Sequence, residues 1–203
     1  DSNPDNINAL LSILASAPEM AFESASVLTD YLLDQGIGSR TEIQSTATSM
    51  GLLERTEDGI RISANGEAIA QTRDDVRGDH LHYLMYTGWS PQFPTEFLQS
   101  WAYRQVCDQY WALGTVELTG NYLDRQVGEI IGFAQDTFSA LNVGVFDEIS
   151  FSRKSLTGAH NWLKAVQPPV IRNKTTFKSR SFCPPELLVL AIGYILREEE
   201  SVA

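Results

Sequence analysis

The chain has 203 residues, of which 43% are hydrophobic, 10% aromatic and 20% charged, and its formal net charge at pH 7 is −11. This composition supports one large or two small folded domains, and it excludes a disordered or low-complexity chain. The longest apolar stretch near the end, residues 187–196, is about half the roughly 20 residues that span a membrane. No charged leader followed by an apolar stretch opens the sequence, so we expect a cytoplasmic protein.

The first 77 residues have a net charge of −8 and alternate apolar positions at helical spacing with turn signals. Asn3 before Pro4 is a good helix start, and Ser39 with Glu42 forms a capping-box pattern. A hairpin is expected about the Asp58-Gly59 turn. The pattern predicts helices at about 4–18, 24–35, 39–51 and 63–72, and a hairpin at 52–62.

This order of elements is typical of a winged helix-turn-helix domain. The stretch from Gly51-Leu-Leu-Glu-Arg to Asp58-Gly-Ile-Arg-Ile-Ser-Ala-Asn-Gly-Glu-Ala-Ile resembles the wing of many prokaryotic winged-helix regulators, and the resemblance covers roughly residues 5–75. It implies that the third helix enters the major groove and that the wing contacts the DNA backbone. The residues implied are Arg40, Thr41, Gln44, Ser45 and Thr48 at bases, and Arg55 and Arg61 at phosphates.

Charge separates this domain from the DNA-binding version of the family. Glu42 lies on the expected recognition helix, and Glu57 and Asp58 lie on the wing. Because neutralised phosphates supply most of the non-specific affinity for DNA, we favour self-association or partner docking over DNA contact for this domain.

Residues 78–120 are rich in aromatic side chains. Nine of the 20 aromatic residues lie between Tyr83 and Trp111, and Gly88, Pro91 and Pro94 predict a loop with a helix on either side. We expect a core that connects two domains. The alternatives are an aromatic protein interface or a platform on which nucleobases stack. A stacking platform needs nearby cations, and Arg104 is the only basic residue between Asp79 and Asn121 apart from the histidines, which argues against nucleic-acid binding here.

The last third of the chain is basic. A helix is predicted from Asn121 to about Leu141, in which Gly128 and Gly132 share a face and would permit a close approach of another helix. Residues 151–185 contain no acid and include every lysine of the protein. A helix at 153–166, a hairpin at 170–182 about Asn173-Lys174, and a final helix at 186–199 are expected. This order suggests a second winged-helix-like unit, whose last helix packs inward or across a dimer.

The basic segment is the predicted nucleic-acid site, because charge asymmetry along a chain points to a polyanion. Cations together with hydroxyl and amide groups suit phosphates and base edges. The alternatives are an acidic protein surface as the partner, or a solvated basic face. The predicted site residues are Arg153, Lys154, Ser155, Thr157, His160, Asn161, Lys164, Arg172, Lys174, Lys178 and Arg180.

Catalytic signals are sparse. The three histidines include His80 and His82, which do not face each other on a helix, and the cysteines Cys107 and Cys183 form no Cys-x-x-Cys pair. No phosphate-binding, nucleophile-elbow or dinucleotide motif is present. We expect reduced thiols, no metal, no cofactor and no enzymatic activity.

The sequence therefore predicts a mostly α fold with short β-hairpins, in which tandem winged-helix-like domains at 1–77 and 121–203 are joined by an aromatic-rich helical connector at 78–120. The first functional hypothesis is a DNA-binding accessory subunit of a DNA-processing or defence assembly, or a transcription regulator. The acidic first domain would then self-associate or dock a protein partner. The competing hypothesis is a protein-interaction adaptor without nucleic-acid contact, similar to the tandem winged-helix subunits of chromosome-organising complexes.

Overall fold

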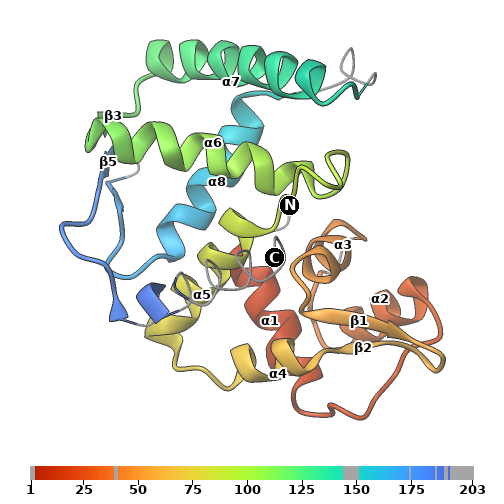
Figure 1. Cartoon of the computed structure of the whole chain (residues 1–203). Helices are drawn as coiled ribbons and strands as arrows, with labels where there is room; N and C mark the ends of the chain where they lie inside the picture. Colours follow the sequence, from red (N-terminus) through yellow and green to blue (C-terminus); the bar gives the residue numbers. More distant parts are fainter. Residues whose placement is uncertain are drawn as a thin grey trace.

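The structure is a computed structural model that describes residues 3–38, 41–143, 151–173, 175–185, 187–189 and 192. The chain is mostly helical and contains two small antiparallel sheets (Figure 1). The helices are α1 (Pro4–Leu14), α2 (Ala25–Asp34), α3 (Thr41–Ser49), α4 (Ala64–Ala70), α5 (Asp74–Thr87), α6 (Leu98–Leu113), α7 (Gly120–Ala140) and α8 (Arg153–Ala165). The strands are β1 (Leu53–Thr56), β2 (Gly59–Ile62), β3 (Thr115–Glu117), β4 (Ile171–Arg172) and β5 (Thr176–Lys178).

The helices α1, α2 and α4 begin where the sequence predicts, whereas Ser39, the predicted cap of the third helix, lies outside the described residues. The side chains of Asn3, Ser24 and Ser63 each accept a hydrogen bond from a backbone N–H in the first turn of α1, α2 and α4, respectively. These contacts satisfy donors that the helix itself leaves free. The first helix ends at Leu14, before the predicted limit near Pro18.

The predicted first hairpin is confirmed as the antiparallel pair β1–β2, with Thr56 opposite Gly59. Gly59 has φ 128°, and a Cβ at this position would overlap the carbonyl oxygen of Phe22. Phe22 forms a bridge to Ile60, so the chain before α2 pairs with the outer edge of the hairpin. Glycine is therefore required here both by the backbone angle and by the close approach.

The C-terminal sheet has a strand that the sequence pattern does not predict. The expected second hairpin is confirmed as β4–β5, and β3 adds to it in the order β3-β5-β4. The helix after β3 begins at Gly120, because Thr119 rather than the predicted Asn121 provides the capping side chain. Along the chain the elements follow the order α6–β3–α7–α8–β4–β5. The sheet therefore combines a strand that precedes α7 with two strands that follow α8.

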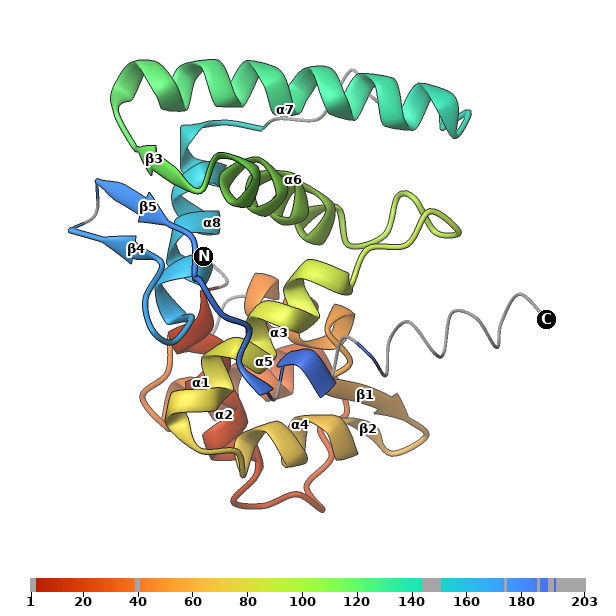
Figure 2. The same cartoon turned by 60° about the vertical axis from the view of Figure 1, so that its left-hand side comes forward.

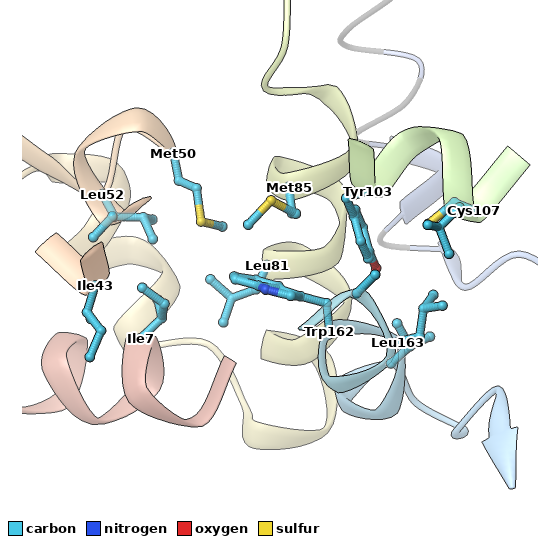
Figure 3. Packing of buried hydrophobic residues seen from close by; sticks show 14 of the residues in the cluster. Ile7, Ile43, Met50, Leu52, Leu81, Met85, Tyr103, Cys107, Trp162 and Leu163 are labelled. Carbon is cyan, nitrogen blue, oxygen red and sulfur yellow. The ribbon is translucent and has the colours of Figure 1, made fainter. Parts of the chain in front are cut away.

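One continuous cluster of buried hydrophobic residues runs from Ile7 to Phe177. Leu81 and Met85 of α5 lie between the side chains of the first helices, such as Ile7, and those of α8, such as Trp162 (Figure 3). Both ribbon views place α7 beyond α6, on the side away from α1 to α4 (Figures 1 and 2). The aromatic connector of the sequence therefore forms the middle of the molecule.

The expectation for Gly128 and Gly132 is wrong. A Cβ at either position would have no heavy atom of the described residues within 4 Å, so no helix of the described residues packs closely against these glycines. The close helix approach lies instead at Gly78 of α5, where a Cβ would overlap the carbonyl oxygen of Ala165 in α8. None of the helices in the described ranges is long and apolar enough to cross a membrane.

Candidate nucleic-acid interface

The helix that begins the acid-free segment, α8, is capped by its own hydroxyl groups. The Oγ of Ser155 accepts a hydrogen bond from the Ser152 backbone N–H at 3.2 Å, which completes a capping box. Ser155 is half-buried, whereas Lys154 and Thr157 are exposed at the same end of the helix. The Oγ1 of Thr157 donates to the backbone carbonyl of Arg153 at 3.0 Å. The first turns of α8 therefore present Lys154 and Thr157 to solvent.

Arg153 is bound to a carboxylate of the protein itself. Its guanidinium donates from two nitrogens to the carboxylate of Asp124 in α7, and also to the carbonyl of Gly120 at 3.1 Å. The hydrogen bonds from Arg153 lower the pKa of Asp124. Both side chains are more than half exposed, so this pair joins α7 to α8 at the surface and reduces the charge that Arg153 offers to a polyanion.

Arg180 does not lie on a basic surface, contrary to the prediction. It forms a buried ion pair with Asp79 of α5, in which an Arg180 guanidinium nitrogen, Nη2, lies 2.6 Å from the carboxylate and the side chains are 6% and 4% exposed. Asp79 also accepts the backbone N–H of Gln167 at 3.2 Å. A buried charge of this kind requires its partner, so Arg180 ties the chain after β5 to α5 and is not accessible to a nucleic acid.

His160 is buried as well, which corrects its predicted place on the outer face of α8. The ring Nε2 lies 2.7 Å from the hydroxyl of Tyr110, and that hydroxyl donates to Gln126 at 2.9 Å. Burial, together with the positive charge of Lys164, lowers the pKa of His160 to about 4. The neutral ring is therefore part of a polar network between α6, α7 and α8.

The C-terminal half of α8 is covered by α1. Lys164 is half-buried and its Nζ donates to the side-chain oxygen of Asn161 at 3.0 Å. The two side chains and Ala165 line a cavity of about 330 Å³ together with Asn3, Pro4 and Asp5 at the start of α1. Because the first helix packs here, this half of α8 is not free to enter a groove of DNA.

The hairpin formed by residues 170–178, which we call the basic hairpin, keeps its cations exposed. Arg172 and Lys178 are both exposed and make no ion pair within the described ranges. The register places Arg172 opposite Thr176, and alternation along β5 puts Lys178 on the same face. Figure 2 shows β4 and β5 projecting from the body of the molecule. Lys174, at the turn between the strands, lies outside the described residues.

The outer face of the C-terminal sheet is not uniformly basic. Glu117 of β3 lies opposite Thr176, whose hydroxyl donates to the Glu117 carboxylate at 3.1 Å and 3.2 Å. One row across the sheet is thus Glu117, Thr176 and Arg172. The strongest positive field is therefore expected along β4 and at Lys178 rather than at β3.

The secondary candidates in the first 77 residues also differ in exposure: some are exposed, and others are buried or paired. Thr41, Ser45 and Thr48 are exposed on α3, whereas Gln44 is only 4% exposed and donates to the hydroxyl of Thr29 at 2.7 Å, so it does not face outward as predicted. Arg61 of β2 is paired with Glu54 of β1 at 2.6 Å, and Arg55 is exposed. Arg40 lies outside the described residues.

No three histidine, cysteine or acidic side chains of the described ranges gather as a metal site. His82 instead forms a hydrogen bond between its Nδ1 and the hydroxyl of Tyr103 at 2.6 Å, and burial with the charge of Arg180 lowers its pKa to about 4. Cys107 and Cys183 are free thiols, the first buried and the second exposed.

Sequence reasoning missed the groups that surround Arg180. Asp79 and Arg180 are 101 positions apart, and a lone aspartate on a predicted helix resembles any solvated acid. One local signal was available: Asp79 is followed three residues later by His82, which places both on one side of α5. The chain matches no protein-family model, no curated protein and no solved structure. Its function therefore has to be inferred from the arrangement of its own residues.

Proposed function

We propose that the chain is a tandem winged-helix protein that binds the backbone of double-stranded DNA through the basic hairpin. The order of α1 to α4 around β1–β2 supports a first winged-helix unit in residues 1–77. The order α6–β3–α7–α8–β4–β5, with the first strand added to the last hairpin, supports the second. In this proposal the second unit starts at α6 rather than at Asn121, α8 takes the place of the recognition helix and the basic hairpin takes the place of the wing.

The distribution of ion pairs is the observation that carries the proposal. Among the described arginines, only Arg55 and Arg172 form no ion pair with a described carboxylate. Lys178 joins Arg172 on one exposed face. A protein with a net charge of −11 that leaves adjacent cations unpaired on a projecting hairpin has an anion-binding element there.

The covered half of α8 defines the kind of contact. Arg153 is paired, His160 is buried and Lys164 lies next to α1, and the exposed residues near the N-terminus of α8 include Lys154 and Thr157. Few base edges are then within reach, so binding depends on phosphates. Two or three phosphate contacts give a slope of about −2 to −3 in a plot of log affinity against log salt concentration. Weak, sequence-tolerant binding of this kind suits an accessory subunit of a larger DNA-processing or defence assembly better than a regulator.

The test is a salt titration of DNA binding, followed by fluorescence anisotropy of a labelled duplex. We expect the R172E/K178E variant to bind about tenfold more weakly at low salt, and its salt slope to fall in magnitude by about 2. The matched control is R55E, which reverses an exposed arginine on the first hairpin. Equal losses in the two variants, or no loss in either, would contradict the proposal.

A protein-interaction adaptor is the second candidate, and one observation favours it. The chain after the basic hairpin exposes large apolar side chains at Phe182, Leu188, Val189 and Ile192. Exposed apolar residues close together mark contacts with other proteins. An adaptor would self-associate, as measured by light scattering, and would show no DNA binding even at low salt.

A further inference from the structure

The first 39 residues of the chain hold six acids and no basic side chain, which is the reverse of the acid-free segment at 151–185. Helix α2 carries part of this negative charge, because Asp30 and Asp34 are exposed on it and Glu23 is exposed just before it. None of these three acids forms an ion pair with a described residue. The chain therefore exposes unpaired acids on α2 and unpaired cations on the basic hairpin.

The outer face of α2 also exposes large apolar side chains. Val27 and Leu33 are 46% and 51% exposed. Residues three apart are neighbours on a helix, so Asp30 contacts the surface between these two side chains, and Asp34 follows it one turn later. Apolar groups flanked by charges are typical of surfaces that bind another protein. This face of α2 is therefore suited to a partner that presents cations beside apolar groups.

The basic hairpin presents that combination. Its exposed cations within the described residues are Arg172 and Lys178. The residue after Lys178, Ser179, donates its backbone N–H to the carbonyl of Gly114 at 2.7 Å. Leu113, which directly precedes Gly114, is 59% exposed. An exposed apolar side chain thus lies beside the cationic end of β5, as Val27 and Leu33 lie beside the acids of α2.

The two surfaces are too far apart to meet within one copy, because Figure 1 places α2 and β5 on opposite sides of the molecule. They can meet between copies, when α2 of one copy faces the hairpin of the next. Contacts of α2 with α2, or of hairpin with hairpin, would bring like charges together. Since charges more than about 10 Å away are screened at 0.1 M salt, the groups at the contact outweigh the net charge of −11.

We infer that α2 of one copy binds the basic hairpin of a second copy, with Asp30 and Asp34 facing Arg172 and Lys178. The contact is head-to-tail, so every copy in an assembly offers a further α2 or a further hairpin, and the assembly grows with concentration. One helix face against one hairpin is smaller than a standard interface, and we expect a dissociation constant of about 0.1 mM. The chain is then mostly monomeric at the low micromolar concentrations of a DNA titration.

Analytical ultracentrifugation between about 5 and 500 μM tests the contact. The average mass should rise with concentration in about 100 mM salt and should stay that of a monomer in about 500 mM salt, where the charges are screened. D30K/D34K and R172E/K178E should each weaken self-association about tenfold or more. The matched control is E57K/D58K, which makes the same change of charge away from α2 and should alter self-association less than twofold.

A mixture of the two charge-reversed variants tests the head-to-tail geometry. D30K/D34K keeps an intact hairpin and R172E/K178E keeps an intact α2, so each alone should stay monomeric while an equimolar mixture forms a heterodimer with the wild-type dissociation constant. The variant that combines all four reversals restores opposite charges and should self-associate again. Circular dichroism checks that the variants fold.

Three results would overturn the inference: a wild-type protein that stays monomeric at 500 μM in 100 mM salt, folded variants that do not associate when mixed, or self-association that D30K/D34K leaves unchanged. The last result is the one expected if the exposed apolar residues after the hairpin hold the copies together. The inference is separate from the proposed DNA binding, because the ultracentrifugation contains no DNA. Failure of the anisotropy titration would therefore leave it standing.

Discussion

Each of the two hairpins buries apolar side chains on its inner face, but the hairpins differ in the charge of their outer faces. β1–β2 buries Leu53 and Ile62, and β4–β5 buries Ile171 and Phe177. On the outer face of the first hairpin, Arg61 is paired with Glu54, and the exposed charges are Arg55, Glu57 and Asp58. The second hairpin has no acid within it, and its described cations, Arg172 and Lys178, are exposed.

The comparison shows that the fold depends on the inward apolar residues of each hairpin, whereas a binding partner would contact the outward charges. Alternating apolar residues are sufficient to seat a hairpin on a core. The charge of the outward face contributes little to stability, because exposed ion pairs are weak. The fold therefore does not fix the outward charges, and these differ between the hairpins: Glu57 and Asp58 are exposed at the tip of the first, and Arg172 and Lys178 are exposed on the second.

The largest expected effect lies where the second unit is tied to α5. Replacing Asp79 by alanine leaves Arg180 buried and unpaired, and should reduce the free energy of unfolding by about 3–5 kcal/mol. The control is D75A, which removes an exposed pair with Arg73 and should cost less than about 1 kcal/mol. Urea unfolding measures both, and equal losses would show that the buried pair is not a specific support of the second unit.

Local signals explain which parts of the fold were predictable. The cap at Asn3, the helix start near Ser24 and the hairpin turn at Gly59 depend on residues a few positions apart, and the structure confirms them. β3 was missed because three residues after a helix carry almost no periodicity.

The candidate site was less predictable than the fold. The acid-free segment is a property of the sequence, but the acids that neutralise it come from elsewhere in the chain. Asp124 and Asp79 reach Arg153 and Arg180 from other helices. His160 and Lys164 lie four positions apart on α8, yet one is buried and the other half-buried, because two different helices pack on them. Only tertiary packing decides such cases.

Acid should affect the two units differently, because the described histidines with lowered pKa values, His82 and His160, both lie outside the first 77 residues. Their pKa values of about 4 lie below the usual 6.5, so the folded state resists protonation. Their contribution to stability is complete above pH 6.5 and is lost as the pH falls toward 4. Each accounts for about 2 kcal/mol between pH 7 and pH 5.

The measurement compares urea unfolding at the two pH values. The loss of unfolding free energy between pH 7 and pH 5 should be smaller by about 2 kcal/mol in H82Q or H160Q, and by about 4 kcal/mol in the double variant. An unchanged pH difference in the double variant would show that neither ring is kept neutral by the fold.

The close approach of α5 and α8 gives a smaller effect on stability. G78A places a methyl group against the Ala165 carbonyl and should destabilise the protein by about 1–3 kcal/mol. G132A lies inside α7 with open space around it, and should stabilise the protein by up to about 1 kcal/mol. Thermal unfolding distinguishes the two signs. A stabilising G78A would mean that the two helices separate easily, and that α5 does not hold the units together.

The weakest expected effect tests whether outward charge alone distinguishes the two hairpins. Glu57 and Asp58 are exposed at the tip of the first hairpin, and the E57K/D58K variant gives this tip a positive charge. If the basic hairpin binds phosphates, the second basic tip should raise DNA affinity at low salt by about three- to tenfold and steepen the salt slope. The control is D30K/D34K, which makes the same change of charge on the exposed face of α2 and should raise affinity less, because no projecting hairpin presents those cations. Equal gains in both variants would mean that net charge, rather than hairpin geometry, controls DNA binding, and the two units would then differ only in the total charge they carry.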